Sequence, residues 1–196
     1  MPELNQKSAA HVPDFAGTYR WERRYAVLVK LENAMTEKTL NDLFYDTLKD
    51  VYFAERQILK TLPKLAKAAK SEELKSAFLT HRDETEGHAA RLEQVFEMMG
   101  KRPQSKTCEA IKGILEEGHE MMEEYAGSEA LDAGLIAGGQ AVEHYEMARY
   151  GALKAWATRL GMKDAAALLD QTLQEERKTD VLLSKLAQAK VNLKAA

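Results

Sequence analysis

Cysteine is almost absent from this chain, which has only Cys108 among its 196 residues. A single cysteine cannot form an intramolecular disulfide, and this usage is typical of a reducing compartment such as the cytoplasm. Proline is also scarce, because the four prolines lie at positions 2, 13, 63 and 103 and leave long stretches free to be helical. The composition therefore predicts a cytoplasmic, mainly helical protein.

Two further absences exclude classes of partner. No apolar run approaches the ~20 residues that a membrane-spanning helix requires, and the short run at residues 26–29 is too small for the core of a signal peptide. The formal net charge is only −3, which argues against binding nucleic acid through bulk electrostatics. We therefore expect neither a membrane nor a nucleic acid as partner.

The chain divides by composition near residue 35. Residues 1–35 hold two of the prolines and an aromatic-basic group, which predicts a partly ordered N-terminal arm. Residues 36–196 show helical periodicity, and we expect helices at about 39–69, 71–100, 107–125, 128–161 and 163–189. Two long helices, a crossover that contains a shorter helix, and two more long helices predict an all-α, ferritin-like four-helix bundle, although bundles without metal share this plan.

An internal repeat pairs the two long hairpins. A shift of 91 residues places Glu55 on Glu146 and Glu84 on Glu175 without a gap. Each glutamate lies in an apolar stripe with steps of three and four, which on the last helix we trace through Glu175 and Leu182. At the rise of an α-helix, each pair meets at one level, roughly 22 Å from its turn. We therefore expect four carboxylates in one layer of the core.

A layer of four buried carboxylates needs something that offsets its negative charge. A buried carboxylate without a partner is costly, and two divalent cations between the four would offset that cost. Oxygen ligands favour hard ions, so iron is the first expectation and manganese or magnesium are alternatives. A second interpretation stays open, in which some of the glutamates reach solvent or pair with Arg149.

Other candidate ligands lie one helical turn away. His88 follows Glu84 by four residues, and Glu143 precedes Glu146 by three. His81, Glu176 and Asp180 flank the same stripes, and the sequence leaves their role open. The predicted metal ligands are Glu55, Glu84, His88, Glu143, Glu146 and Glu175. No side chain is predicted to be catalytic.

The two halves of the repeat differ in their histidines. His88 falls on Thr179 and His81 on Thr172, so neither imidazole has a counterpart in the second hairpin. We therefore expect an asymmetric site, in which one metal has a nitrogen ligand that the other lacks. Glu143 is the expected compensating ligand on the other side.

Four stretches carry a resemblance to a known family: LKDVYFAERQ at 48–57, ETEGHAARLEQV at 84–95, VEHYEMARYG at 142–151 and TLQEERKTDVL at 172–182. Together they resemble the YciE/YciF family of bacterial ferritin-like stress proteins over residues 36–196. The resemblance implies a five-helix ferritin-like fold, usually dimeric, with a rubrerythrin-like metal site and a role in stress. Residues 1–34 have no counterpart in the family pattern.

The chain departs from the ferritin and rubrerythrin pattern at its second long helix. Those proteins carry Glu-x-x-His on two helices, whereas here the spacing is Glu84-x-x-x-His88. We expect a di-metal carboxylate protein that handles iron and an oxidant under stress, with ferroxidase and peroxide-reducing activity both open. The alternatives are a non-catalytic helical interaction protein and an accessory to a catalase or another stress protein that binds through the arm. The expectation of a homodimer comes from the resemblance.

Overall fold

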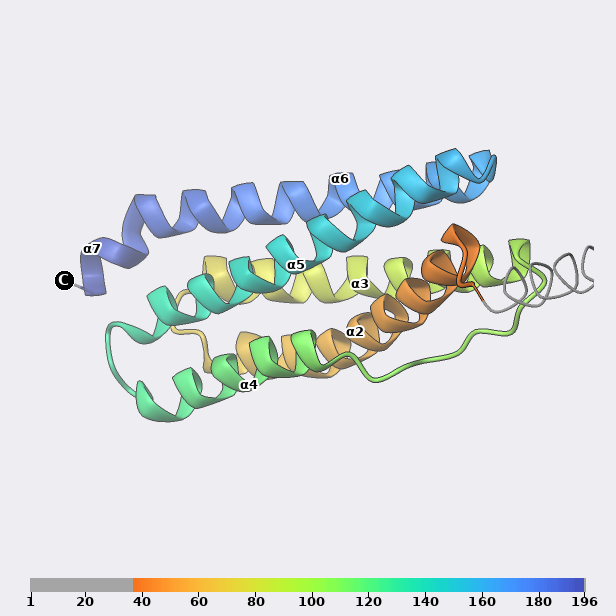
Figure 1. Ribbon diagram of the computed structural model, residues 1–196. Coiled ribbons are helices and arrows are strands. Elements are labelled where there is room, and N and C mark those ends of the chain that lie inside the picture. The colour runs from red at the N-terminus through yellow and green to blue at the C-terminus, as the bar shows by residue number, and fades with distance from the viewer. Residues whose placement is uncertain (1–36, 196) are drawn as a thin grey trace, which may run out of the picture. The chain divides into compact units, whose positions relative to one another are not determined.

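The computed structural model describes residues 37–195, and all its regular elements are helical (Figure 1). The compact helical unit begins at Leu40. Its elements are α2 (Leu40–Ala68), α3 (Glu72–Met98), α4 (Glu109–Glu124), α5 (Leu131–Arg159), α6 (Lys163–Leu186), the π-helical turn η1 (Ala187–Val191) and α7 (Asn192–Ala195). The predicted arm at residues 1–35 lies outside the described residues. In the described part, every helix is too short or too polar to span a bilayer.

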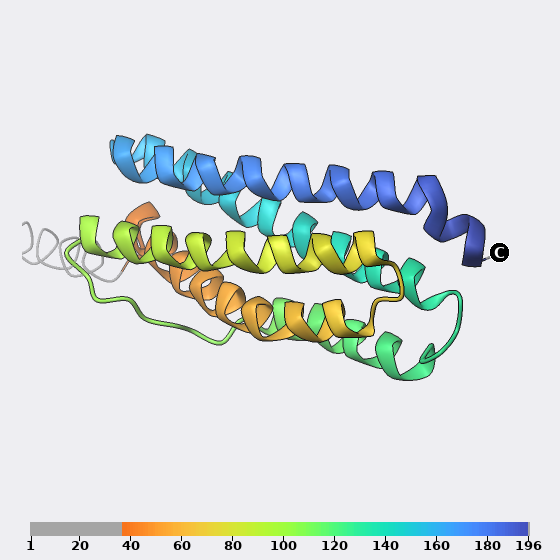
Figure 2. The same ribbon diagram turned by 180° about the vertical axis from the view of Figure 1, so that it is seen from behind.

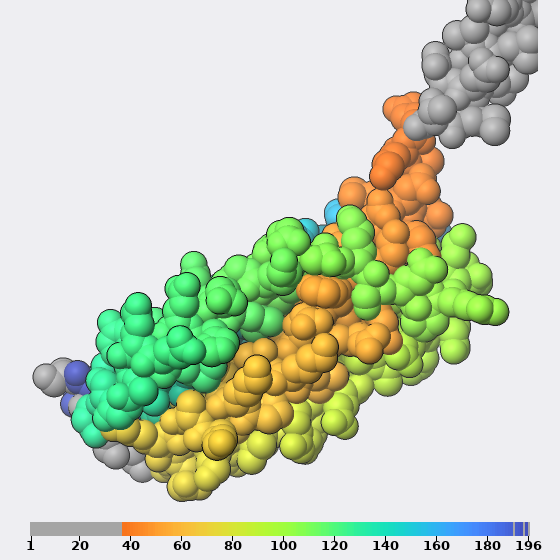
Figure 3. All heavy atoms as spheres, turned by 90° about the horizontal axis from the view of Figure 1, so that it is seen from below, coloured from red at the N-terminus to blue at the C-terminus, as the bar shows by residue number. Residues whose placement is uncertain are grey.

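Two antiparallel hairpins form the bundle, as Figures 1 and 2 show. Helix α2 packs on α3 and α5 packs on α6, while α3 also contacts α6 and α2 contacts α5. The shorter helix α4 packs on α5 and α2, and Figure 3 shows α4, α2 and α3 beside one another on one face. The all-α four-helix bundle with a short helix in the crossover is confirmed.

The helix boundaries follow local chemistry. Ser71 caps α3, because its hydroxyl accepts a hydrogen bond from the Leu74 N–H at 3.3 Å. Gly161 takes the left-handed backbone (φ 78°) that ends α5, and Met162 N–H then reaches Ala157 O at 2.9 Å. The last helix was expected to end at about residue 189. Instead, α6 ends at Leu186 and the chain continues through η1 and α7.

The crossover between the hairpins is fixed along α2. Lys106 N–H donates to Lys49 O at 3.2 Å, and the Tyr45 hydroxyl donates to Gln104 at 3.2 Å. Cys108, buried at the start of α4, lies 3.1 Å from the Tyr145 hydroxyl on α5. These contacts hold α4 against α2 and α5, outside the four-helix core.

The core consists of two apolar groups separated along the bundle axis. On α2, Val51 belongs to one group and Ile58 to the other. On α6, Leu173 and Leu183 divide in the same way. The residues between these positions form a buried polar layer, and that layer contains the candidate site.

Asp132 on α5 ties the two hairpins together. Its carboxylate is buried and accepts hydrogen bonds from the backbone N–H groups of Lys70 and Ser71, each at 2.8 Å. These donors lie at the start of α3, where the N–H groups have no partner within the helix. A residue of the second hairpin therefore caps the second helix of the first.

We predict that Asp132→Ala lowers the free energy of unfolding by about 2 kcal/mol, because two backbone donors lose a charged acceptor. Urea denaturation measures the change. The control is Glu116→Ala on the exposed face of α4, for which we expect a change within about 0.5 kcal/mol. Equal effects of the two substitutions would show that the Asp132 cap contributes nothing.

Candidate metal centre

Six acidic and imidazole side chains meet in the polar layer, and none is more than 3% exposed. We call this set the six-residue cluster: Glu55, His81, His88, Glu143, Glu146 and Glu176. All four long helices contribute to it, since α2 provides one residue, α3 two, α5 two and α6 one. Charged groups are almost never buried to this degree without a partner, so the cluster is the main electrostatic feature of the bundle.

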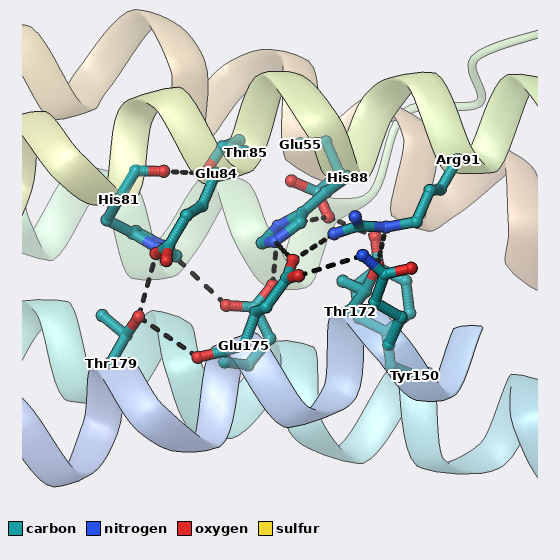
Figure 4. Close-up of polar contacts among 12 residues, drawn as sticks. Glu55, His81, Glu84, Thr85, His88, Arg91, Tyr150, Thr172, Glu175 and Thr179 are labelled. Carbon is teal, nitrogen blue, oxygen red and sulfur yellow. Dashed lines mark hydrogen bonds and ion pairs between the residues drawn. The ribbon is translucent and has the colours of Figure 1, made fainter. Parts of the chain in front are cut away.

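Helical spacing explains why these side chains converge. His81 and His88 are seven residues apart, two turns of α3, and Figure 4 shows both directed toward the bundle interior. Glu143 and Glu146 are three apart and share a face of α5. Each helix thus presents its polar residues at the same level as the other three.

The first group of ligand atoms comes from His81, Glu143, Glu146 and Glu176. His81 Nε2 lies 3.2 Å from Glu143 Oε1 and 3.9 Å from Glu176 Oε2. One ligand atom from each of the four residues lies within 4.8 Å of the others. This group has three carboxylates and one imidazole.

The second group comes from Glu55, His88 and Glu176. His88 Nδ1 lies 2.9 Å from Glu176 Oε1 and 3.7 Å from Glu55 Oε1, and the three residues offer ligand atoms within 4.8 Å of one another. The His88 and Glu176 contact is close enough for an ion pair but is not aligned as a hydrogen bond. Glu176 belongs to both groups, so its carboxylate joins them.

Several carboxylate oxygens in the cluster have no hydrogen-bond partner among residues 37–195. They are both oxygens of Glu146 and of Glu176, and Oε2 of Glu55 and Glu143. Tyr150 donates from its buried hydroxyl to the other oxygen of Glu55 (Figure 4). Leaving such atoms unpaired in a core costs free energy, which a cation between them would recover.

The electrostatics of the cluster raise several pKa values. Burial, and then the negative charge of Glu176, raise the pKa of Glu143 well above its usual range. Burial raises the pKa of Glu146 in the same way, with added repulsion from Glu176 and Glu55. Burial alone would lower the pKa of His88, but the adjoining carboxylates of Glu176 and Glu55 outweigh it and raise that pKa to about 10. The cluster therefore binds protons when no other cation is present.

The structure brings together four of the six predicted ligands: Glu55, His88, Glu143 and Glu146. It does not bring Glu84 and Glu175 into either group, because their side chains lie on the solvent side of the two histidines and are 38% and 21% exposed. It adds His81 and Glu176, whose role the sequence left open. The second interpretation holds in part, because the Glu84 side chain reaches solvent, whereas the Arg149 guanidinium lies over the Tyr145 ring at 5.3 Å.

The prediction that Glu175 is the core residue of α6 is wrong, because the buried face of this helix passes through other positions. Leu182, placed on the same stripe, is 42% exposed, whereas the buried positions of α6 include Leu169, Leu173 and Leu183. Glu176 follows Leu169 by seven residues and Leu173 by three, so it shares their face. A stripe drawn through those leucines would have identified Glu176.

The expected asymmetry in nitrogen ligands is also not found. Each group contains one imidazole, His81 in the first and His88 in the second, so the groups differ in their number of carboxylates instead. Asp180, the remaining open candidate, lies outside both groups, where it contacts Gln140 at 2.9 Å and His144 at 3.3 Å.

The fold and the cluster together define a ferritin-like four-helix bundle with a buried carboxylate and histidine layer. A family model described as a domain of unknown function, DUF892, matches residues 39–196, and the chain belongs to this family. The chain is 44% identical to protein YciF of Escherichia coli (strain K12) over 162 residues, which is 82% of this chain and 98% of that protein.

Two solved structures of similar proteins share the fold. The crystal structure of the E. coli stress protein YciF aligns with a TM-score of 0.76 and 43% identity over 80% of this chain and 99% of that chain. YcfI from Rhodopseudomonas palustris aligns with a TM-score of 0.73 and 41% identity over 75% of this chain and 94% of that one. The helical bundle thus extends over most of the length of each relative.

We predict that chelator-treated protein loses free energy of unfolding as the pH rises from about 5 to about 8. The Glu146 carboxyl has a pKa near 4.5 in the unfolded chain and a higher pKa in the folded protein, because burial favours its protonated form. The stability gained from this proton is complete below pH 4.5 and is lost as the pH rises above it. His88 acts in the same direction. Its contribution to the free energy of unfolding is complete below pH 6.5 and is lost as the pH rises toward 10, because its pKa is raised from 6.5 to about 10.

Urea denaturation at several pH values across this range measures how steeply the free energy of unfolding falls with pH. Glu146→Gln should make the slope shallower, because one titrating group is removed, and exposed Glu86→Gln on α3 should leave it unchanged. A stability that is flat or rises with pH in the wild type would contradict the raised pKa values.

Proposed function

We propose that this protein binds two divalent metal ions in the six-residue cluster, with iron first and manganese or magnesium as alternatives. It would handle iron together with oxygen or peroxide in the cytoplasm under stress. The observation that carries the proposal is the set of buried carboxylate oxygens without a hydrogen-bond partner, all directed into one polar layer between two apolar groups. A hydrogen-bonded structural network would have satisfied those atoms.

The residues fit the proposed ions in chemistry and number. Four carboxylates carry up to four negative charges, which two divalent ions neutralise, and the two imidazoles suit iron(II) and manganese(II). His81, Glu143 and Glu146 would hold one ion, and Glu55 and His88 the other. Glu176 would bind both, because its two oxygens face the two groups.

Bound iron(II) would supply the electrons that oxygen or peroxide takes up. The protein's own residues set the conditions for that chemistry. The carboxylates hold the site in a region from which the apolar groups on both sides exclude bulk water. Tyr150 orients Glu55 by donating to one of its oxygens, so that the other oxygen stays available.

We predict that the wild type binds two ions of iron(II) or manganese(II) per chain and that Glu176→Gln weakens both binding steps. The substitution keeps the side-chain shape and removes the charge that the two groups share. Saturating metal at about 100 times the dissociation constant should stabilise the wild type by about 2.7 kcal/mol per site. Elemental analysis of protein loaded without chelators, together with thermal melts, measures both effects.

Two variants serve as controls for this experiment. Glu143→Gln lies in the first group alone and should weaken one binding step while sparing the other. Glu86→Gln, on the exposed face of α3, should bind like the wild type. A wild type without bound metal, with identical melting temperatures in saturating metal, would favour the alternative of a non-catalytic helical interaction protein.

The resemblance described above supports a homodimer, and a catalase or other stress-protein partner that contacts the arm at residues 1–34 is the alternative. Sedimentation of the purified chain tests the dimer. Deletion of residues 1–34, followed by co-purification, tests whether the arm contributes to a partner contact. Retained co-purification would remove the arm from the proposal.

A further inference from the structure

A second row of carboxylates lies outside the six-residue cluster, where α3 packs on α6. Glu84 lies 3.7 Å from Nδ1 of His81, and Glu175 lies 3.1 Å from Nε2 of His88 (Figure 4). The opposite nitrogens, Nε2 of His81 and Nδ1 of His88, face the cluster. Each imidazole therefore lies between the cluster and one outer carboxylate.

The Glu175 carboxylate is held in a fixed position. Its Oε2 accepts a hydrogen bond from Arg91 Nη2 as well as facing His88, and its Oε1 accepts from Gln171 at 3.3 Å. Arg91 is itself oriented, because its Nε donates to the buried Thr172 hydroxyl at 2.9 Å. The guanidinium also offsets the charge of Glu175, so this carboxylate adds little to the negative charge of the cluster.

The equivalent position on the other histidine is held more loosely. The Glu84 side chain is 38% exposed, and its distance from His81 exceeds that of a hydrogen bond. His81 Nδ1 instead lies 3.4 Å from the Thr179 hydroxyl. Glu84 and Glu175 occupy equivalent positions in the 91-residue repeat, so one can serve as the control for the other.

We propose that Glu175, fixed by Arg91, is a positioning residue that accepts the Nε2–H of His88 and so directs the Nδ1 lone pair into the cluster. A neutral imidazole has one N–H, and the hydrogen bond that this N–H makes determines which nitrogen binds a metal. His88 then binds through Nδ1 and His81 through Nε2. This inference rests on the proposed function and assigns a role that the proposed ligand set does not include.

Zinc(II) is a suitable probe because it is diamagnetic, and its affinity is measured by competition with a chromogenic chelator. Glu175→Ala should weaken one binding step about 10- to 100-fold. Glu175→Gln should fall between Glu175→Ala and the wild type, because the amide oxygen still accepts a hydrogen bond but carries no charge. Glu84→Ala should change the affinity by less than about threefold.

Nitrogen NMR of zinc-loaded, ¹⁵N-histidine-labelled protein gives a readout that a merely structural role would not move. The His88 signals, assigned by their loss in His88→Gln, should show a protonated Nε2 and a metal-bound Nδ1. Glu175→Ala should lose this pattern and Glu84→Ala should retain it.

The outcomes separate the two proposals. A wild type that binds no zinc would overturn both the metal site and the positioning role. A wild type that binds zinc, with Glu175→Ala unchanged in affinity and in the His88 spectrum, would overturn the positioning role alone. If Glu175→Ala does not fold, Arg91→Gln replaces it, because this variant keeps the carboxylate but removes its fixing contact. Unchanged zinc affinity in Arg91→Gln would likewise overturn the role.

Discussion

The mutual repulsion of four carboxylates, enclosed by apolar side chains, is the constraint on which the arrangement of this bundle depends. Glu55, Glu143, Glu146 and Glu176 are buried at one level, with apolar groups on either side. Their charge is neutralised by protons, by the two imidazoles or by bound cations, and the raised pKa values of Glu143 and Glu146 express the first of these. Divalent ions satisfy the same oxygens without protonation, which is why a metal site is the simplest explanation of the layer.

The surrounding elements serve this layer in distinct ways. Asp132 joins the start of α3 to α5, so the helices that carry the two histidines and two of the glutamates keep their relative position. Tyr150 leaves one oxygen of Glu55 free by binding the other. On the solvent side, Arg91 and Glu175 support the outer nitrogen of His88. Packing and polar contacts therefore both act on the geometry of six side chains.

Much of the fold could be predicted from the sequence, because helix periodicity, the Ser71 cap and the glycine stops are local signals. The repeat identified Glu55 and Glu146 correctly as core residues, since both lie inside clear apolar stripes. It failed on α3, where Glu84 is 38% exposed, and on α6, where the repeated residue, Glu175, faces outward. Adjacent residues such as Glu175 and Glu176 point about 100° apart around the helix axis. Thr85, the repeat counterpart of Glu176, is fully buried, so the structural repeat holds although the residue type differs. The stripe of Leu169, Leu173 and Leu183 indicates which face of α6 is buried, and packing against α3 and α5 fixes that face.

Anomalous X-ray scattering from crystals grown with manganese(II) tests the metal site most directly. We expect two anomalous peaks, one on each side of the Glu176 carboxylate, the first in contact with His81 and the second with His88. A well-ordered cluster without an anomalous peak, its carboxylates hydrogen-bonded to one another or to water at saturating manganese(II), would contradict the site.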